Sequence, residues 1–126
     1  TLDVVSYVLT DDAIGDALVA ARERNVQVRV IIDADGSTST GSELRKLCAA
    51  GVWVKVEDWP SKQHGKWAVA DARAVVFGSQ NWTAAGNNRN DENTLFIEND
   101  DFAAEFEHEF ARQWADLAAV EPCASL

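Results

Sequence analysis

Residues that can act together on a phosphate ester lie within a short stretch of this chain. His64, Lys66 and Asp71 are spaced as His-x-Lys-x₄-Asp, and Ser79 and Asn81 follow in a Gly-Ser-x-Asn segment. A neutral imidazole is a nucleophile near neutral pH, and an ammonium can neutralise phosphoryl oxygens. A lone histidine would be more readily interpreted as structural. Residues i and i+2 of a strand share a face, so the side chains of His64 and Lys66 should project together, which favours a catalytic role for His64. Ser79 and Asn81 can donate hydrogen bonds to the phosphate.

Strands and helices alternate along the chain, as apolar runs, helical periodicity and capping residues indicate. Strands are expected at 2–9, 26–32, 52–56, 66–70, 74–77 and 93–98, and helices at 10–24, 42–51 and from about Asp100 onward. The pattern predicts an α/β fold with a mixed, largely parallel sheet flanked by helices. Residues 33–41 are expected to form a polar loop, and Asp33, Asp35 and Asp58 to be solvated loop carboxylates rather than metal ligands.

The last helix carries an apolar stripe at helical spacing, which predicts packing against the core rather than a ligand site. The stripe consists of Phe102, Phe106, Phe110, Trp114 and Leu117. His108 lies between Glu107 and Glu109, off that stripe, and is expected at the surface.

The chain has 126 residues, 47% of them hydrophobic, which is enough for one domain with a buried core. We expect a single domain at 1–121 and a tail at 122–126. No run approaches the ~18 apolar residues of a membrane span, no signal peptide is visible, and the compartment stays open. Cys48 is expected to be a buried thiol; a disulfide with Cys123 is possible, but nothing in the sequence supports it.

The net charge of −10 disfavours polyanionic partners in general, but the charge is uneven. Residues 91–121 contain ten acids and one base, whereas residues 51–90, which include the His-Lys-Asp motif, contain five bases and three acids. The motif segment is therefore locally positive.

The His-x-Lys-x₄-Asp and Gly-Ser-x-Asn segments resemble the HKD motif of the phospholipase D superfamily. Within it, the chain is similar to small bacterial endonucleases that carry one HKD motif and pair to build one site. The segments Val5-Ser6-Tyr7, 17–21 and 28–33 share this likeness. The family fold begins with a further strand and helix before residues 2–9. Their absence here suggests the later part of a longer protein, one half of a two-motif enzyme among the possibilities.

The resemblance implies roles for individual residues. His64 would be nucleophile or general acid, and Lys66, Ser79 and Asn81 would bind the scissile phosphate. In Asn90-Asp91-Glu92-Asn93, Glu92 matches the carboxylate that orients the histidine, and Asp71 would support the geometry of the motif. The family reaction needs a second histidine, from another copy across a two-fold axis or from a second HKD domain, and requires no metal or cofactor.

These features favour a phosphodiesterase that acts through a phosphohistidine. A nuclease is the leading hypothesis, and a phospholipase D or phosphatidyltransferase domain is the alternative. Four tryptophans near the motif can serve a lipid or a base equally well: Trp53, Trp59, Trp67 and Trp82. A noncatalytic binding module is a third reading, which the intact motif disfavours.

Overall fold

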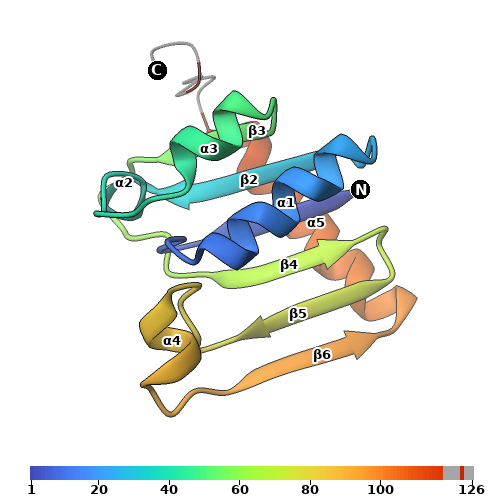
Figure 1. Ribbon diagram of the computed structural model, residues 1–126. Coiled ribbons are helices and arrows are strands. Elements are labelled where there is room, and N and C mark those ends of the chain that lie inside the picture. Colours follow the sequence, from blue (N-terminus) through green and yellow to red (C-terminus); the bar gives the residue numbers. More distant parts are fainter. Residues whose placement is uncertain (118–122, 124–126) are drawn as a thin grey trace.

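The computed structural model describes residues 1–117 and residue 123 as three layers, with a six-stranded sheet between helices (Figure 1). The strands are β1 (Leu2–Ser6), β2 (Val28–Asp33), β3 (Trp53–Glu57), β4 (Lys66–Ala70), β5 (Ala74–Gly78) and β6 (Thr94–Glu98). The helices are α1 (Asp12–Glu23), α2 (Ala34–Ser37), α3 (Leu44–Ala49), α4 (Ala84–Asn88) and α5 (Asp100–Asp116). Helices α1 and α3 lie on one face of the sheet and α5 crosses the other (Figure 1).

The sheet has the order β3-β2-β1-β4-β5-β6 and mixes both kinds of pairing. β1, β2 and β3 are parallel to one another, whereas β1–β4, β4–β5 and β5–β6 are antiparallel. The prediction of a mixed α/β sheet flanked by helices is confirmed, but the sheet is not largely parallel: three of its five strand pairs are antiparallel, and parallel pairing is limited to the half built by helical crossovers. A short turn at 71–73 joins β4 to β5, and so short a connection can only produce an antiparallel pair.

Both faces of the sheet are buried in its parallel half. On the α1 and α3 face, Val4, Val30 and Ile32 pack against Leu18 and Leu47. The opposite face packs against the aromatic stripe of α5, as expected from its spacing. Phe110 is fully buried there with Val5 and Ile31, while Phe106 packs beside Val69 and Val75. The site-bearing ends of the strands are thus held from both sides.

Two short helices were not anticipated. α2 occupies the segment expected to be a polar loop, because Asp33 accepts a hydrogen bond from the backbone N–H of Asp35 and caps it. α4 follows β5 and is capped by the Thr83 hydroxyl, which accepts from Gly86 N. Both are too short to show a helical period in the sequence.

The expectation of a free buried thiol at Cys48 is wrong. Cys48, on α3, forms a disulfide with Cys123, which packs against the core cluster on the α1 and α3 face. The two residues are 75 positions apart, so proximity in the sequence gave no sign of the pair. The predicted boundary between residues 121 and 122 lies outside the described part of the chain.

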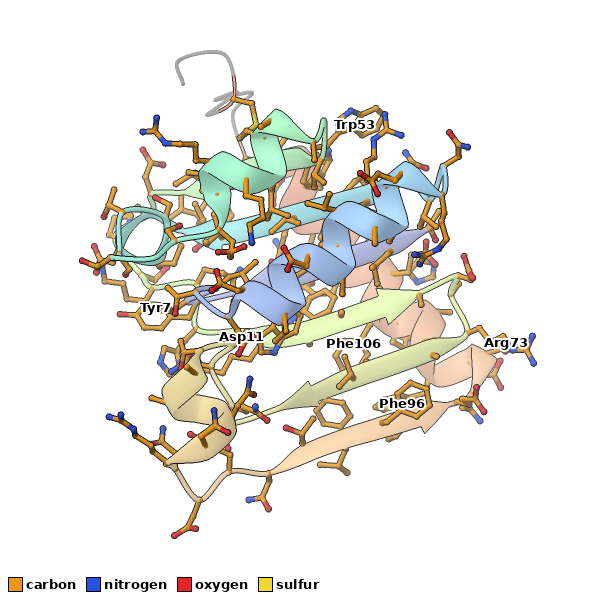
Figure 2. All side chains as sticks on the ribbon, viewed as in Figure 1. Tyr7, Asp11, Trp53, Arg73, Phe96 and Phe106 are labelled. Atoms are coloured by element: carbon orange, nitrogen blue, oxygen red, sulfur yellow. A yellow bond between two sulfur atoms is a disulfide. The ribbon has the colours of Figure 1, made fainter. Side chains whose placement is uncertain are left out.

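The two ends of the sheet differ in what they carry. The carboxyl ends of β1, β2, β3 and β5 and the amino ends of β4 and β6 meet at one end, which we call the motif end because His64 and Lys66 lie there. Figure 2 shows Tyr7, just after β1, at this end and Arg73, in the β4–β5 turn, at the other. Among the described residues, no helix is long and apolar enough to cross a membrane.

Candidate active site

His64 and Lys66 form the centre of the motif end. Lys66 begins β4, is only 6% exposed, and places Nζ 3.1 Å from His64 Nδ1 and 2.7 Å from the His64 carbonyl oxygen. His64 itself is exposed and precedes the strand rather than lying on it. The two groups project together as the sequence predicts, but the lysine side chain achieves this by folding back over the histidine.

Tyr7 lies beside His64 and Lys66, although the sequence analysis gave it no role. Its ring lies 4.8 Å from the His64 imidazole, centroid to centroid, and Lys66 Nζ is 5.5 Å from its centroid. Tyr7 follows β1, the strand that pairs with β4, and its backbone N–H donates to Gly65 O. A tyrosine at the carboxyl end of a central strand was the only available signal.

Ser79 and Glu92 lie next to Lys66. The Ser79 hydroxyl donates to Glu92, which also accepts from Asn90 Nδ2 at 3.0 Å. These hydrogen bonds hold the pKa of Glu92 below its ordinary value, and the Lys66 ammonium adds to the effect. Among the described residues no hydrogen bond joins Glu92 to His64, so the expected orienting contact is not made within one chain.

Burial lowers the pKa of Lys66 below the ordinary lysine value of 10.5, and the nearby Glu92 carboxylate partly opposes this. Lys66 is thus an ammonium taken out of water beside a histidine and a carboxylate. A desolvated cation of this kind interacts strongly with an anionic ligand.

The Gly78-Ser79-Gln80-Asn81 segment brings Asn81 to the same end of the sheet. A Cβ at Gly78 would lie 1.9 Å from Asn93 O, so only glycine allows β5 and the start of β6 to approach here. The Asn81 Oδ1 atom is buried without a hydrogen-bond partner among the described residues. Of this amide, only Nδ2 can donate to a phosphate oxygen, since Oδ1 is an acceptor.

Asp71 does not join the other motif residues. It lies in the β4–β5 turn with φ at 54°, its side chain is 73% exposed, and Oδ1 accepts from the Thr1 amino group at 2.6 Å. Asp71 follows the last residue of β4, whereas Lys66 is the first, so the two lie at opposite ends of the strand, roughly 17 Å apart at strand spacing. The geometry gives Asp71 a place in the turn and no contact with the site.

Behind His64 lies a buried polar group that the sequence reading missed. Asp33, expected to be a solvated loop residue, is 2% exposed at the end of β2, and Glu57 at the end of β3 is 4% exposed. Gln63 bonds to both. Asp35 and Asp58 are exposed or nearly so, as expected. No cluster of three or more His, Cys, Asp or Glu suited to a metal occurs in the part of the chain that the structure describes.

The remaining candidates lie elsewhere. His108 is exposed on α5, as predicted. Trp67 packs in the core against Phe106 and Phe110, and Trp53 lies at the start of β3, the far end of the sheet (Figure 2). Neither is placed to contact a ligand at the motif end.

This arrangement, a mixed sheet that gathers His64, Lys66, Ser79, Asn81 and Glu92 at one end, is that of a phospholipase D-like domain. Residues 1–114 match the family model described as "Cardiolipin synthase, PLD-like domain". The chain belongs to this family and thus to the phospholipase D superfamily.

Relatives with different names share this likeness. The mitochondrial cardiolipin hydrolase of Homo sapiens is 34% identical over 114 residues, which are 90% of this chain and 45% of that protein. A phospholipase D of Rickettsia conorii is 34% identical over 101 residues, 80% of this chain and 50% of that protein. The chain thus spans about half the length of these relatives. The crystal structure of Nuc, a phospholipase D family member from Salmonella typhimurium, superposes with a TM-score of 0.87 at 30% identity, covering 93% of this chain and 79% of Nuc.

Proposed function

We propose that this domain hydrolyses phosphodiesters without a metal, through a phosphohistidine at His64. The observation that carries the proposal is the buried Lys66 ammonium held 3.1 Å from His64 Nδ1, at the end of the sheet that also presents Ser79 and Asn81. The family relationship supports phosphodiester chemistry. Lys66, Ser79 and Asn81 would together neutralise and hydrogen-bond the non-bridging oxygens of the scissile phosphate.

The reaction would have two displacements at phosphorus. In the first, His64 Nε2 forms a bond to phosphorus and the bond to the leaving oxygen breaks, while a second histidine donates a proton to that oxygen. In the second, the same histidine takes a proton from water, the water oxygen bonds to phosphorus, and the His64–phosphorus bond breaks. Both histidines end in their starting protonation states.

One chain holds only part of this machinery. While Lys66 is an ammonium it can only donate, so Nδ1 of His64 accepts and the neutral ring carries its proton on Nε2. That neutral tautomer can donate a hydrogen bond through Nε2 but cannot attack phosphorus there, and only the doubly protonated ring can serve as the general acid. A carboxylate that accepts a hydrogen bond from Nδ1 would reverse the tautomer and release Lys66 to the phosphate.

We therefore propose that the working site forms between two HKD units, as a homodimer or with a second domain of a longer chain. Across a two-fold axis the second histidine is another copy of His64. Glu92 has no hydrogen bond to its own His64 among the described residues, and in the assembled site it would orient the histidine of the other unit.

For the substrate, we propose nucleic acid. The end of α4 and the two residues after it add polar groups at this end of the sheet: Asn87, Asn88, Arg89 and Asn90 are exposed. Of the large exposed apolar side chains, Trp53 is at the far end of the sheet, and Leu95, Phe96 and Phe102 belong to β6 and α5. Trp59, 38% exposed, lies in the loop from β3 to His64 and is a flat ring that can stack on a base. A polar rim suits a hydrated polyanion better than an acyl chain.

A phospholipid headgroup is the second candidate. It is favoured by the names of the relatives, cardiolipin hydrolase and phospholipase D, and by the net charge of −10, which disfavours a polyanion.

The test is hydrolysis of bis(p-nitrophenyl) phosphate in excess EDTA, with light scattering on the same sample. Turnover in a dimer is expected, with loss in His64→Gln and retention in His108→Gln, a matched change at the other histidine. Turnover that survives in His64→Gln, or that requires added divalent metal, would contradict the mechanism.

Single-stranded DNA and cardiolipin vesicles then separate the substrates. Cleavage of DNA that weakens steeply with salt supports the nuclease. Cleavage of cardiolipin without cleavage of DNA would overturn the proposed nuclease and support the phospholipase D alternative.

A further inference from the structure

Gln63, the residue before His64, uses its hydrogen-bonding groups entirely on buried or adjacent partners. Its backbone N–H donates to Asp33 Oδ2 at 2.8 Å, and Nε2 donates to Glu57 Oε2 and to Gln113 Oε1, each at 2.8 Å. Its Oε1 accepts from Gly65 N at 3.1 Å. We call Asp33, Glu57, Gln63 and Gln113 the Gln63 network.

The direction of the amide follows from its surroundings. Nε2 faces two acceptors, the oxygens of Glu57 and Gln113, and Oε1 faces a backbone donor. Reversing the amide would oppose oxygen to oxygen on one side and donor to donor on the other. One orientation alone satisfies all of its partners.

The partners of Gln63 are themselves fixed. Asp33 and Glu57 are paired residues at the carboxyl ends of β2 and β3, and Gln113 comes from α5 on the other face of the sheet. All three are at most 9% exposed. Gln113 also donates to Glu109 Oε1 at 2.7 Å. The network therefore ties the segment before β4 to two strands and to a helix.

The consequence falls on His64. Its ring is exposed, so burial does not fix it, but the residues on both sides are held. Gly65 donates to Gln63 Oε1, and its carbonyl accepts from Tyr7 N at 3.1 Å. A Cβ on Gly65 would lie 2.9 Å from Gln63 Oε1 and 2.9 Å from Val5 Cγ1, so any side chain larger than that of glycine would push these neighbours away.

The Gln63 network buries two carboxyl groups, which is unfavourable unless their hydrogen bonds offset the loss of water. Burial raises the pKa of Glu57 and the charge of Asp33 raises it further, although the Gln63 hydrogen bond opposes both effects. Buried ionised groups that need many partners are commonly no more stabilising than apolar side chains of similar volume. The network lies directly before His64 in the chain, where it can fix the position of the imidazole.

We propose that Gln63 is the positioning residue of His64, which it holds in line for attack through Gly65 and its own backbone. It does not touch the phosphate; it acts by fixing the backbone on both sides of the nucleophile. The inference rests on the proposed function of His64 and names a residue outside the His-Lys-Ser-Asn set.

The test is Gln63→Met, which keeps the length of the side chain and removes its donors and acceptor. The matched control is Gln27→Met, because Gln27 is exposed just before β2, at the far end of the sheet. With bis(p-nitrophenyl) phosphate, well below the unfolding temperature, we expect kcat to fall roughly 30- to 100-fold with KM within about threefold, as misplacement of a reacting group predicts. Gln27→Met should match the unchanged protein. A kcat within twofold of that protein in Gln63→Met would overturn the proposal.

A second readout does not depend on turnover. The chain has two histidines, so ring ¹⁵N spectra contain two sets of signals, which His108→Gln assigns. Gln63→Met should shift or broaden the His64 signals and leave those of His108 in place. Unchanged His64 signals in Gln63→Met would overturn the positioning role even if the unsubstituted protein were inactive. Inactivity of the unsubstituted protein, together with the expected spectral change in Gln63→Met, would count against the proposed phosphodiesterase alone. If Gln63→Met does not fold, Gln63→Glu keeps an acceptor for Gly65 and takes the same two measurements; loss of the fold in both would make the residue structural and refute the proposal.

Discussion

At its amino end, strand β4 begins with Lys66, 6% exposed and in contact with His64, while at its carboxyl end Asp71 lies in an exposed turn bound to the Thr1 amino group. Both ends belong to one short sequence motif. The Lys66 ammonium at the first end is taken out of water and held by hydrogen bonds to His64, whereas the Asp71 carboxylate at the second end remains in water. Proximity in a sequence motif is therefore a poor guide to proximity in a site when a strand lies between the residues.

After His64→Gln, the largest effect is expected from Lys66→Met. The substitution keeps the buried stem and removes the charge that faces His64, so kcat should fall by about 10²–10³-fold, as loss of a preorganised electrostatic group does. Steady-state hydrolysis of bis(p-nitrophenyl) phosphate measures this. Lys62→Met is the matched control, because Lys62 is exposed and pairs with Asp35. Equal losses in the two variants would remove the distinction drawn for Lys66.

Glu92→Gln should have the next largest effect. The amide keeps the size of the side chain but cannot orient an imidazole as a carboxylate does, so kcat should fall about 10- to 100-fold. The measurement is the same assay, with light scattering to confirm an unchanged assembly. Glu98→Gln, at the exposed end of β6, serves as control. Full activity in Glu92→Gln would exclude Glu92 from the site.

The pH dependence should report the buried end of β4. Because the pKa of Lys66 lies below 10.5, its ammonium is lost at lower pH than that of an ordinary lysine, and kcat/KM should fall on the alkaline side below pH 10.5. Lys66→Arg keeps its charge to higher pH, so this alkaline limb should disappear whatever the absolute rate. A pH–rate profile from pH 6 to about 11 measures both; an identical limb in Lys66→Arg would assign it to another group.

The smallest effect is expected at the far end of β4. Asp71→Asn removes the charge of a carboxyl group in an exposed turn. The hydrogen bond from the Thr1 amino group is the chief reason why the pKa of that carboxyl lies below its ordinary value. The rate should change by less than about twofold, because Asp71 lies at the other end of β4 from the site and an exposed ion pair contributes little to the stability of the fold. The same assay checks this, and a loss comparable with that of Lys66→Met would show that Asp71 acts over the length of the strand.

Much of this arrangement is predictable from the sequence, because local patterns determine it. Apolar alternation placed the six strands within a few residues, and the spacing of Phe106 and Phe110 predicted the face of α5 that packs on the sheet. The pairing of His64 with Lys66 was likewise readable, although the reason was incomplete. Lys66 reaches back over a histidine that lies before the strand.

The rest depends on contacts between distant positions. Asp33 is followed by polar residues and looks solvated, yet Gln63, 30 positions later, covers it. The Cys48–Cys123 disulfide and the tilted ring contact between Tyr7 and His64 also join positions far apart in the sequence. The antiparallel pairing of β4 with β5 follows from the short turn at 71–73, but the alternation of helices and strands along the sequence led us to expect a largely parallel sheet.

The measurement that tests the central claim most directly is the site of covalent modification during turnover. The protein would be mixed with bis(p-nitrophenyl) phosphate, quenched within milliseconds in alkaline denaturant, and digested for peptide mass analysis. The account predicts an aryl phosphoryl group on His64, in at most one of every two chains, because two HKD units share one site. Attachment to any other residue, or equal labelling in His64→Gln, would contradict it.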